Sequence, residues 1–83
     1  MYYVYILECS DKSLYVGWTN NLEKRIYSHN HAKSGAHYTK IRRPVKLKYF
    51  KKFRLLSKSR KRENEIKSWT RKKKLELIKN KII

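Results

Sequence analysis

The chain has 83 residues and a formal net charge of +17, because 23 lysines and arginines outnumber only 6 aspartates and glutamates. This length allows one small domain and excludes a second. The sequence shows no apolar run of membrane-spanning length and no secretory signal pattern, and its single cysteine, Cys9, excludes an internal disulfide framework. We therefore expect one domain over residues 1–83, a cytoplasmic location and no membrane partner.

The positive charge is concentrated in the second half of the chain. Residues 1–40 carry five basic and three acidic side chains, a net charge of +2, whereas residues 41–83 carry 18 basic and three acidic ones, a net charge of +15. Such an asymmetry predicts contact with a polyanion, most simply nucleic acid. Two alternatives are a lysine-rich composition that only maintains solubility, and a basic helix that lies on an anionic membrane.

Two runs rich in β-branched and aromatic residues, 2–8 and 13–19, predict a β-hairpin. If the turn between them centres on Ser10–Asp11, Tyr5 lies roughly opposite Tyr15, with both phenols on one face of the pair. The other face would be apolar and would consist of Val4, Ile6, Leu14 and Val16.

Residues 20–30 predict a helix that follows the hairpin. Asn20, with Glu23 three residues further on, resembles a capping box, in which the asparagine oxygen accepts a free backbone N–H. Leu22 and Ile26 are four residues apart and would form the buried stripe of this helix.

A second pair on this helix, Arg25 and His29, shares the same four-residue spacing and therefore one neighbouring stripe. A guanidinium and an imidazole would then lie side by side at the edge of the packed face. A zinc site is not expected, because the spacing of the candidate ligands does not match one: Cys9, His29, His31 and His37.

The segment 32–43 mixes small and basic residues and predicts a loop or a short irregular helix, which ends before Pro44. Residues 45–50 alternate between apolar and basic and predict a third strand with one wet face. Its apolar face would consist of Val45, Leu47 and Tyr49.

From Ser57 to the end, the sequence predicts helix. Ser57 or Ser59 would cap the first helix, and Thr70 would cap the last one. The inward residues of the last helix would be Leu75, Ile78 and Ile82.

Glu63 lies on or beside the inward stripe of the first of these helices, together with Leu56, Ile66, Lys67 and Trp69. A carboxylate on an apolar stripe in so basic a segment needs an explanation. The simplest one is an ion pair with Lys67, four residues further on, which would stabilise the helix by ~0.3–0.5 kcal/mol.

These residues together resemble a known family. Val4-Tyr5-Ile6, followed nine residues later by Tyr15-Val16-Gly17, resembles the paired motif of the GIY-YIG nuclease superfamily. Arg25 and His29 follow at the offsets of that family's helix, and the segment 63–67 resembles its metal-binding glutamate region. The resemblance covers nearly the whole chain and is closest to the small, single-domain members.

The resemblance implies an α+β fold, in which helices flank a three-stranded antiparallel sheet. It also implies an endonuclease that hydrolyses DNA phosphodiester bonds with one Mg²⁺ or Mn²⁺ ion and no small-molecule cofactor. Glu63 would bind the metal, and Arg25 would bind a phosphate oxygen. Tyr15 would be the general base, Tyr5 would hydrogen-bond the phosphate or the attacking water, and His29 would orient Tyr15 or relay its proton.

The strongest candidates for nucleic-acid contacts are basic: Arg25, Lys40, Arg42, Arg43, Lys67 and Arg71. The expected partner is DNA, and RNA is the alternative. A rival hypothesis is a module of the same fold that binds DNA or RNA without cleaving it, and a third is a basic protein associated with RNA or the ribosome. Contacts to phosphate carry no sequence information, so weak sequence specificity is expected in each case.

Overall fold

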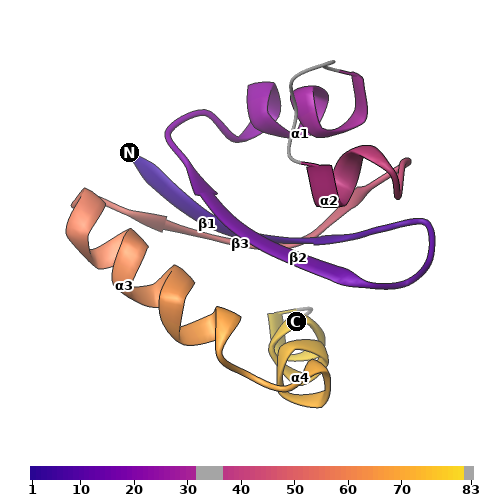
Figure 1. Ribbon diagram of the computed structural model, residues 1–83. Helices are drawn as coiled ribbons and strands as arrows, with labels where there is room; N and C mark the ends of the chain where they lie inside the picture. Colours follow the sequence, from indigo (N-terminus) through magenta and orange to yellow (C-terminus); the bar gives the residue numbers. More distant parts are fainter. Residues whose placement is uncertain (32–36, 82–83) are drawn as a thin grey trace.

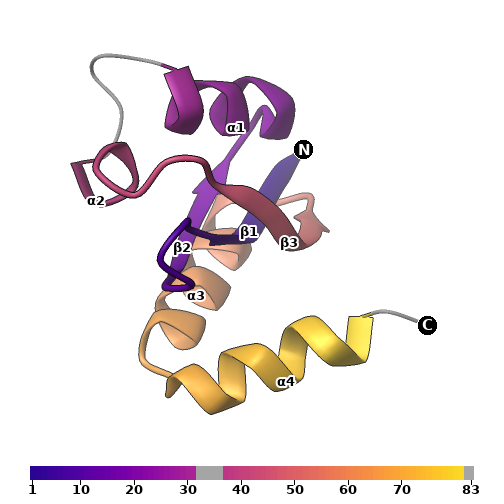
Figure 2. The ribbon, with the colours of Figure 1, turned by 90° about the vertical axis from the view of Figure 1, so that its right-hand side faces the viewer.

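The computed structural model describes residues 1–31 and 37–81. The strands form one antiparallel sheet in the order β2-β1-β3, so β1 is the central strand. Helices α1 and α2 cover one face of this sheet, and α3 and α4 cover the other (Figures 1 and 2). The elements are β1 (Tyr2–Glu8), β2 (Leu14–Thr19), α1 (Leu22–His31), α2 (His37–Lys40), β3 (Lys46–Phe53), α3 (Leu56–Lys67) and α4 (Arg71–Lys81). The expected fold, a three-stranded antiparallel sheet flanked by helices, is confirmed. Within residues 1–31 and 37–81, no helix has the length and apolar character needed to cross a membrane.

The predicted pairing of Tyr5 with Tyr15 is wrong by two residues. In the structure Tyr5 pairs with Gly17, and Tyr15 pairs with Leu7. The turn centres on Asp11, whereas a pairing of Tyr5 with Tyr15 requires a centre at Ser10, one residue earlier. Lys12 adopts a left-handed conformation in this turn, with φ 71°. A shift of one residue in the turn centre moves every partner by two, so both tyrosines still lie on the same face.

The ring of Tyr5 explains why residue 17 is glycine. A Cβ atom at this position would lie 2.5 Å from the Tyr5 hydroxyl oxygen and 2.7 Å from its Cζ atom. The phenol therefore packs across the backbone of β2 in a space that any larger residue would fill.

Two apolar clusters, one on each face of the sheet, hold the layers together. The cluster under α3 and α4 is built from Val4, Ile6, Val16, Tyr49 and Ile66. The cluster under α1 is built from Tyr5, Leu7, Cys9 and Val45, with Leu22 and Ile26 packed against it. The expected apolar hairpin face and the expected buried stripe of α1 are therefore confirmed.

The third strand changes faces along its length. The pairing of β1 with β3 is irregular between Ile6 and Leu7, whose partners are Tyr49 and Leu47. Lys48 is the extra residue of this bulge, and an extra residue reverses the alternation that follows it. Leu47 therefore packs on the α1 side and Tyr49 on the α3 side, so the prediction that they share a face is wrong.

The helix ends also differ from the predicted ones. Asn21, not Asn20, caps α1, because its Oδ1 atom accepts the Lys24 N–H at 3.1 Å. No side chain caps α3, whose N-cap is Leu55. Ser59 is instead buried and donates its hydroxyl hydrogen bond to the Leu56 carbonyl at 2.7 Å.

The cap of α4 is as predicted, since Thr70 accepts the Lys73 N–H at 3.2 Å. The inward face is different, because Leu77 and Ile78 pack on the core while Leu75 is 39% exposed. Ile82 lies outside the described residues.

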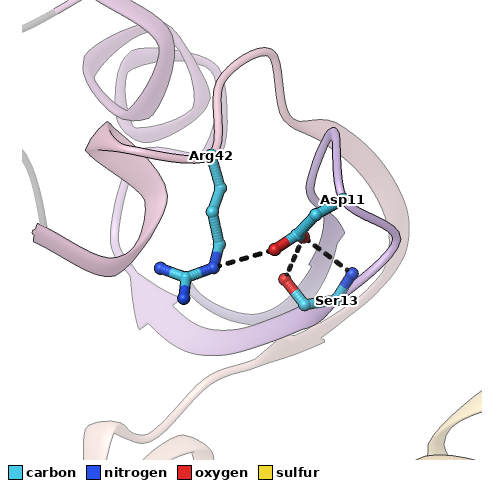
Figure 3. A network of polar contacts seen from close by, with 3 residues as sticks. All are labelled: Asp11, Ser13 and Arg42. Carbon is cyan, nitrogen blue, oxygen red and sulfur yellow. Dashed lines mark hydrogen bonds and ion pairs between the residues drawn. The ribbon is translucent and has the colours of Figure 1, made fainter.

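A polar network joins the β1–β2 turn to the segment that follows α2 (Figure 3). Asp11 accepts hydrogen bonds from the Ser13 backbone and hydroxyl, and it forms an ion pair with the Nε atom of Arg42 at 3.0 Å. These hydrogen bonds, then the charge of Arg42, lower the pKa of Asp11. A backbone hydrogen bond from Ser10 to the Arg42 carbonyl, at 2.9 Å, fastens the same two segments.

Candidate active site

The α1/α2 face of the sheet encloses a buried polar chain of three side chains. The Tyr5 hydroxyl oxygen lies 2.9 Å from Nε2 of His29, and Nδ1 of His29 lies 2.7 Å from Oγ1 of Thr39. Tyr5 and His29 are each 2% exposed, and Thr39 is fully buried. The chain therefore links β1, α1 and α2 through one imidazole ring.

The position of His29 follows from the pattern of α1. His29 lies three residues after Ile26 and seven after Leu22, which places all three on one face of the helix. It is therefore buried within this face, further inward than the predicted edge position. Arg43 fixes this end of the helix, because its guanidinium donates to the carbonyls of His29 at 2.6 Å and Ser28 at 3.3 Å.

Asn30 fixes the end of α1 from a second side. Its Oδ1 atom accepts the backbone N–H of Val45 at 2.8 Å, and its Nδ2 atom donates to the Val45 carbonyl at 3.2 Å. The last turn of α1 is thus held against the start of β3, and the imidazole of His29 has a rigid base.

Tyr15 contacts His29 through its ring. The centroids are 5.1 Å apart and the planes meet at 65°, an edge-on arrangement. The hydrogen bond of His29 at Nε2 goes to Tyr5. That His29 orients Tyr15 or relays its proton stays a prediction, and the ring contact is what the two side chains share. Tyr5 takes the Nε2 hydrogen bond because its side chain crosses Gly17 toward α1, whereas Tyr15 remains half-buried.

Burial keeps both members of the Tyr5–His29 pair neutral. It raises the pKa of Tyr5 well above its usual range, and the nearby Tyr15 raises it further. Arg25 opposes this shift, whereas Glu63 adds to it. Burial, with smaller contributions from Arg25 and Arg43, lowers the pKa of His29 to about 4.

The contributions to the pKa of Tyr5 also indicate which of the predicted site residues lie near one another. Tyr15, Arg25 and Glu63 all lie close enough to Tyr5 to change its pKa, and His29 is bonded to it. The structure therefore brings the five candidate catalytic residues into one neighbourhood, although they come from β1, β2, α1 and α3.

Arg25 lies at the solvent side of this neighbourhood. It is exposed and lines a hollow of about 210 Å³ together with Asn20, Asn21, Lys24 and Ser28. An exposed guanidinium beside a second cation suits an anionic group such as phosphate.

Glu63 is the carboxylate of the neighbourhood. It is 8% exposed, and its Oε2 atom lies 3.2 Å from Nζ of Lys67. Within residues 1–31 and 37–81, no three His, Cys, Asp or Glu side chains form a group that could hold a metal ion. A divalent ion here would take Glu63 as its protein ligand and complete its shell with water and phosphate oxygens, as Mg²⁺ commonly does.

The residues predicted to contact nucleic acid fall into two groups. Lys40, Lys67 and Arg71 are exposed, like Arg25. Arg42 is paired with Asp11, and Arg43 is bonded to the end of α1, so both have structural contacts as well. Their contact with nucleic acid stays a prediction.

Sequence reasoning missed one residue of the site, Thr39. A neutral histidine in a core needs a partner at each ring nitrogen, so a second partner for His29 could have been sought. The sequence could not identify Thr39 as that partner, because ten residues and a helix boundary separate the two side chains.

Phosphodiester chemistry uses the groups gathered here from the sheet and its helices: a phenol, an imidazole, a guanidinium and a carboxylate. Residues 1–76 match the family model described as the GIY-YIG catalytic domain, and the chain belongs to this family. The family is of nuclease type, and its domain implies a nucleic-acid substrate.

The relatives are small proteins that carry the name UPF0213. A UPF0213 protein of Syntrophus aciditrophicus is 60% identical over 77 residues, which cover 93% of this chain and 88% of that protein. One of Clostridium perfringens is 57% identical over 83 residues, 100% of this chain and 88% of the relative. The solution NMR structure of a UPF0213 protein from Bacillus halodurans is similar as well, with a TM-score of 0.64 and 39% identity over 98% of this chain and 86% of that one.

Proposed function

We propose that this protein is an endonuclease that hydrolyses DNA phosphodiester bonds with a divalent metal ion, Mg²⁺ or Mn²⁺. One observation carries the proposal. The buried phenol of Tyr5 is hydrogen-bonded to His29, whose ring also contacts Tyr15, and Arg25 and Glu63 lie near enough to influence its pKa. Membership of a family of nuclease type supports the same conclusion.

Glu63 would hold the metal ion. Its carboxylate is nearly buried but has one ion-pair partner, Lys67, whose side chain is 52% exposed and can be displaced. A metal bound there would neutralise charge on the phosphate and assist the leaving oxygen. Proton transfer and binding of the phosphate would be carried out by the neighbouring tyrosine, histidine and arginine side chains.

The two tyrosines have different tasks. Burial raises the pKa of Tyr5, which therefore keeps its proton. Tyr15 is only half-buried and can meet water. Tyr15 is therefore the proposed general base.

The neutral Tyr5–His29 pair would support this base. If Tyr5 donates its proton to His29, its hydroxyl oxygen would keep lone pairs with which to accept a hydrogen bond from the attacking water. Arg25, exposed at its hollow, would bind a non-bridging phosphate oxygen and hold the scissile bond beside Tyr15.

The ion pair of Glu63 also favours a second candidate, a nucleic-acid-binding module without turnover. In that case Lys67 would be the permanent partner of Glu63, and the exposed lysines of β3, α3 and α4 would bind phosphates.

A cleavage assay separates the two candidates. The wild type, Glu63→Ala, Tyr15→Phe and the matched control Glu65→Ala would be purified identically and assayed on several DNA forms with Mg²⁺ and Mn²⁺. Glu65 is on the same helix, but its side chain is 51% exposed and pairs with Arg62.

The nuclease proposal expects metal-dependent cleavage by the wild type and Glu65→Ala, and its loss in the other two variants while DNA binding persists. Equal residual activity in all four proteins would identify a contaminant and favour the binding module.

A further inference from the structure

The imidazole of His29 can carry its single proton on either ring nitrogen, and the neighbours of the ring decide which. A neutral imidazole donates through one nitrogen and accepts through the other. Both nitrogens of His29 meet a hydroxyl: Nε2 faces the Tyr5 hydroxyl at 2.9 Å, and Nδ1 faces the Thr39 hydroxyl at 2.7 Å.

The hydroxyl of Tyr5 restricts the choice. Tyr5 is 2% exposed, and burial raises its pKa, so the phenol keeps its proton. In residues 1–31 and 37–81, Nε2 of His29 is the hydrogen-bond partner of this hydroxyl, and buried O–H groups are rarely left without an acceptor. Nε2 must therefore accept, which places the imidazole proton on Nδ1.

Thr39 receives that proton's hydrogen bond. Its Oγ1 atom lies at the short distance of 2.7 Å from Nδ1, and a threonine oxygen has lone pairs to accept with. Thr39 is fully buried on α2, so it supports the site from behind.

The segment that carries Thr39 is itself anchored. The backbone N–H of Arg42 donates to the Thr39 carbonyl at 3.0 Å, and the side chain of Arg42 is paired with Asp11 in the β1–β2 turn (Figure 3). The threonine is thus held by the same hairpin that carries the two tyrosines.

We propose that Thr39 is a positioning residue, which accepts the Nδ1–H of His29 and thereby keeps Nε2 available as the acceptor for the proton of Tyr5. The tautomer rests on the burial and hydrogen-bond geometry of these three side chains and is independent of catalysis. The catalytic consequence rests on the proposed nuclease function.

Two substitutions separate the hydroxyl from the volume of the side chain. Thr39→Val keeps the shape but offers Nδ1–H no acceptor. The Nδ1–H form then loses one of its two hydrogen bonds, so the fraction of the Nε2–H form should rise although Tyr5 still favours Nε2 as an acceptor. Thr39→Ser keeps the hydroxyl and is the matched control.

Long-range ¹H–¹⁵N NMR of the His29 ring reads the tautomer directly. The expected result is the Nδ1–H form in the wild type and in Thr39→Ser, and a larger fraction of the Nε2–H form in Thr39→Val. A wild type in the Nε2–H form, or a valine variant with the same tautomer fractions as the wild type, would overturn the proposal. The wild-type spectrum decides the tautomer even if the valine variant does not fold.

The catalytic arm uses cleavage kinetics on DNA. Thr39→Val is expected to lower kcat by about 100-fold, a typical contribution of proton transfer, with unchanged DNA affinity, whereas Thr39→Ser restores cleavage. A valine variant that changes tautomer but cleaves at the wild-type rate would refute the positioning role. A wild type that does not cleave would refute the nuclease function and leave the tautomer result standing.

Discussion

The two faces of the sheet are built on different principles. The α1/α2 face buries a neutral polar chain, Tyr5–His29–Thr39, inside an apolar cluster. The α3/α4 face has an apolar core around Ile66, and its helices turn many lysines and arginines toward solvent. One face therefore offers a few groups with defined proton positions, and the other offers many mobile charges.

The two faces would therefore have different functions: the α1/α2 face would position reacting groups, and the α3/α4 face would attract nucleic acid. Buried hydrogen bonds fix geometry, because each donor must meet an acceptor. Exposed lysines attract phosphate at long range and impose little geometry. Glu63 connects the two, since it lies on α3 of the basic half and yet changes the pKa of Tyr5.

Of the further substitutions that compare the two faces, the largest effect is expected from removing the hydroxyl of the buried pair. Tyr5→Phe should lower kcat by about 100-fold, because His29 loses its partner beside the reacting groups. DNA binding should persist, since the charged residues are untouched. Cleavage and binding measured side by side test this, with Tyr27→Phe as control because Tyr27 is 65% exposed. Equal losses in both variants would contradict a special role of Tyr5.

Gly17→Ala tests the packing that positions this pair. Its Cβ atom would lie 2.5 Å from the Tyr5 hydroxyl, so the ring or the strand must move, and unfolding in urea should show a loss of about 1–3 kcal/mol. The cost should be smaller when Tyr5→Phe removes the hydroxyl first. The same cost in both backgrounds would show that the hydroxyl is not the group that excludes a side chain at residue 17, and would leave the ring carbon Cζ, 2.7 Å from the added Cβ, as the contact that does.

The pH dependence of stability tests the neutrality of His29. Its pKa is lowered to about 4 in the folded protein, against about 6.5 in the unfolded chain, so the unfolded state binds more protons between these values. Its contribution to stability is complete above pH ~6.5 and is lost as the pH falls toward ~4, by roughly 1–3 kcal/mol.

Urea unfolding across this pH range measures the loss. His29→Gln should reduce the pH dependence, whereas His31→Gln, at an exposed position of the same helix, should not. The same pH dependence in the wild type and His29→Gln would contradict a neutral buried imidazole.

The smallest effect is expected on the basic face. Arg71→Gln should weaken DNA binding a few-fold and reduce the slope of log K against log salt by about 0.9 if it contacts one phosphate. Lys12→Gln removes an exposed charge from the hairpin turn and should leave the slope nearly unchanged. If both substitutions reduced the slope equally, DNA binding would depend only on the net charge of the protein, and the α3/α4 face would not be a preferred contact surface.

The sequence by itself determined the elements, the two unequal halves of charge and the identities of five candidate site residues. Alternating residues identify a strand, and four-residue spacing identifies the inward face of a helix, because both patterns are local properties of the backbone. The apolar hairpin face, the stripe of α1 and the Thr70 cap were predictable for this reason.

Only the tertiary structure decided which side chains meet. A turn centred one residue later placed Tyr5 over Gly17, and an extra residue at Lys48 reversed the faces of β3. Thr39 became the partner of His29 because α2 folds back against the end of α1. Such partners depend on register and packing between distant segments, and no local pattern encodes them.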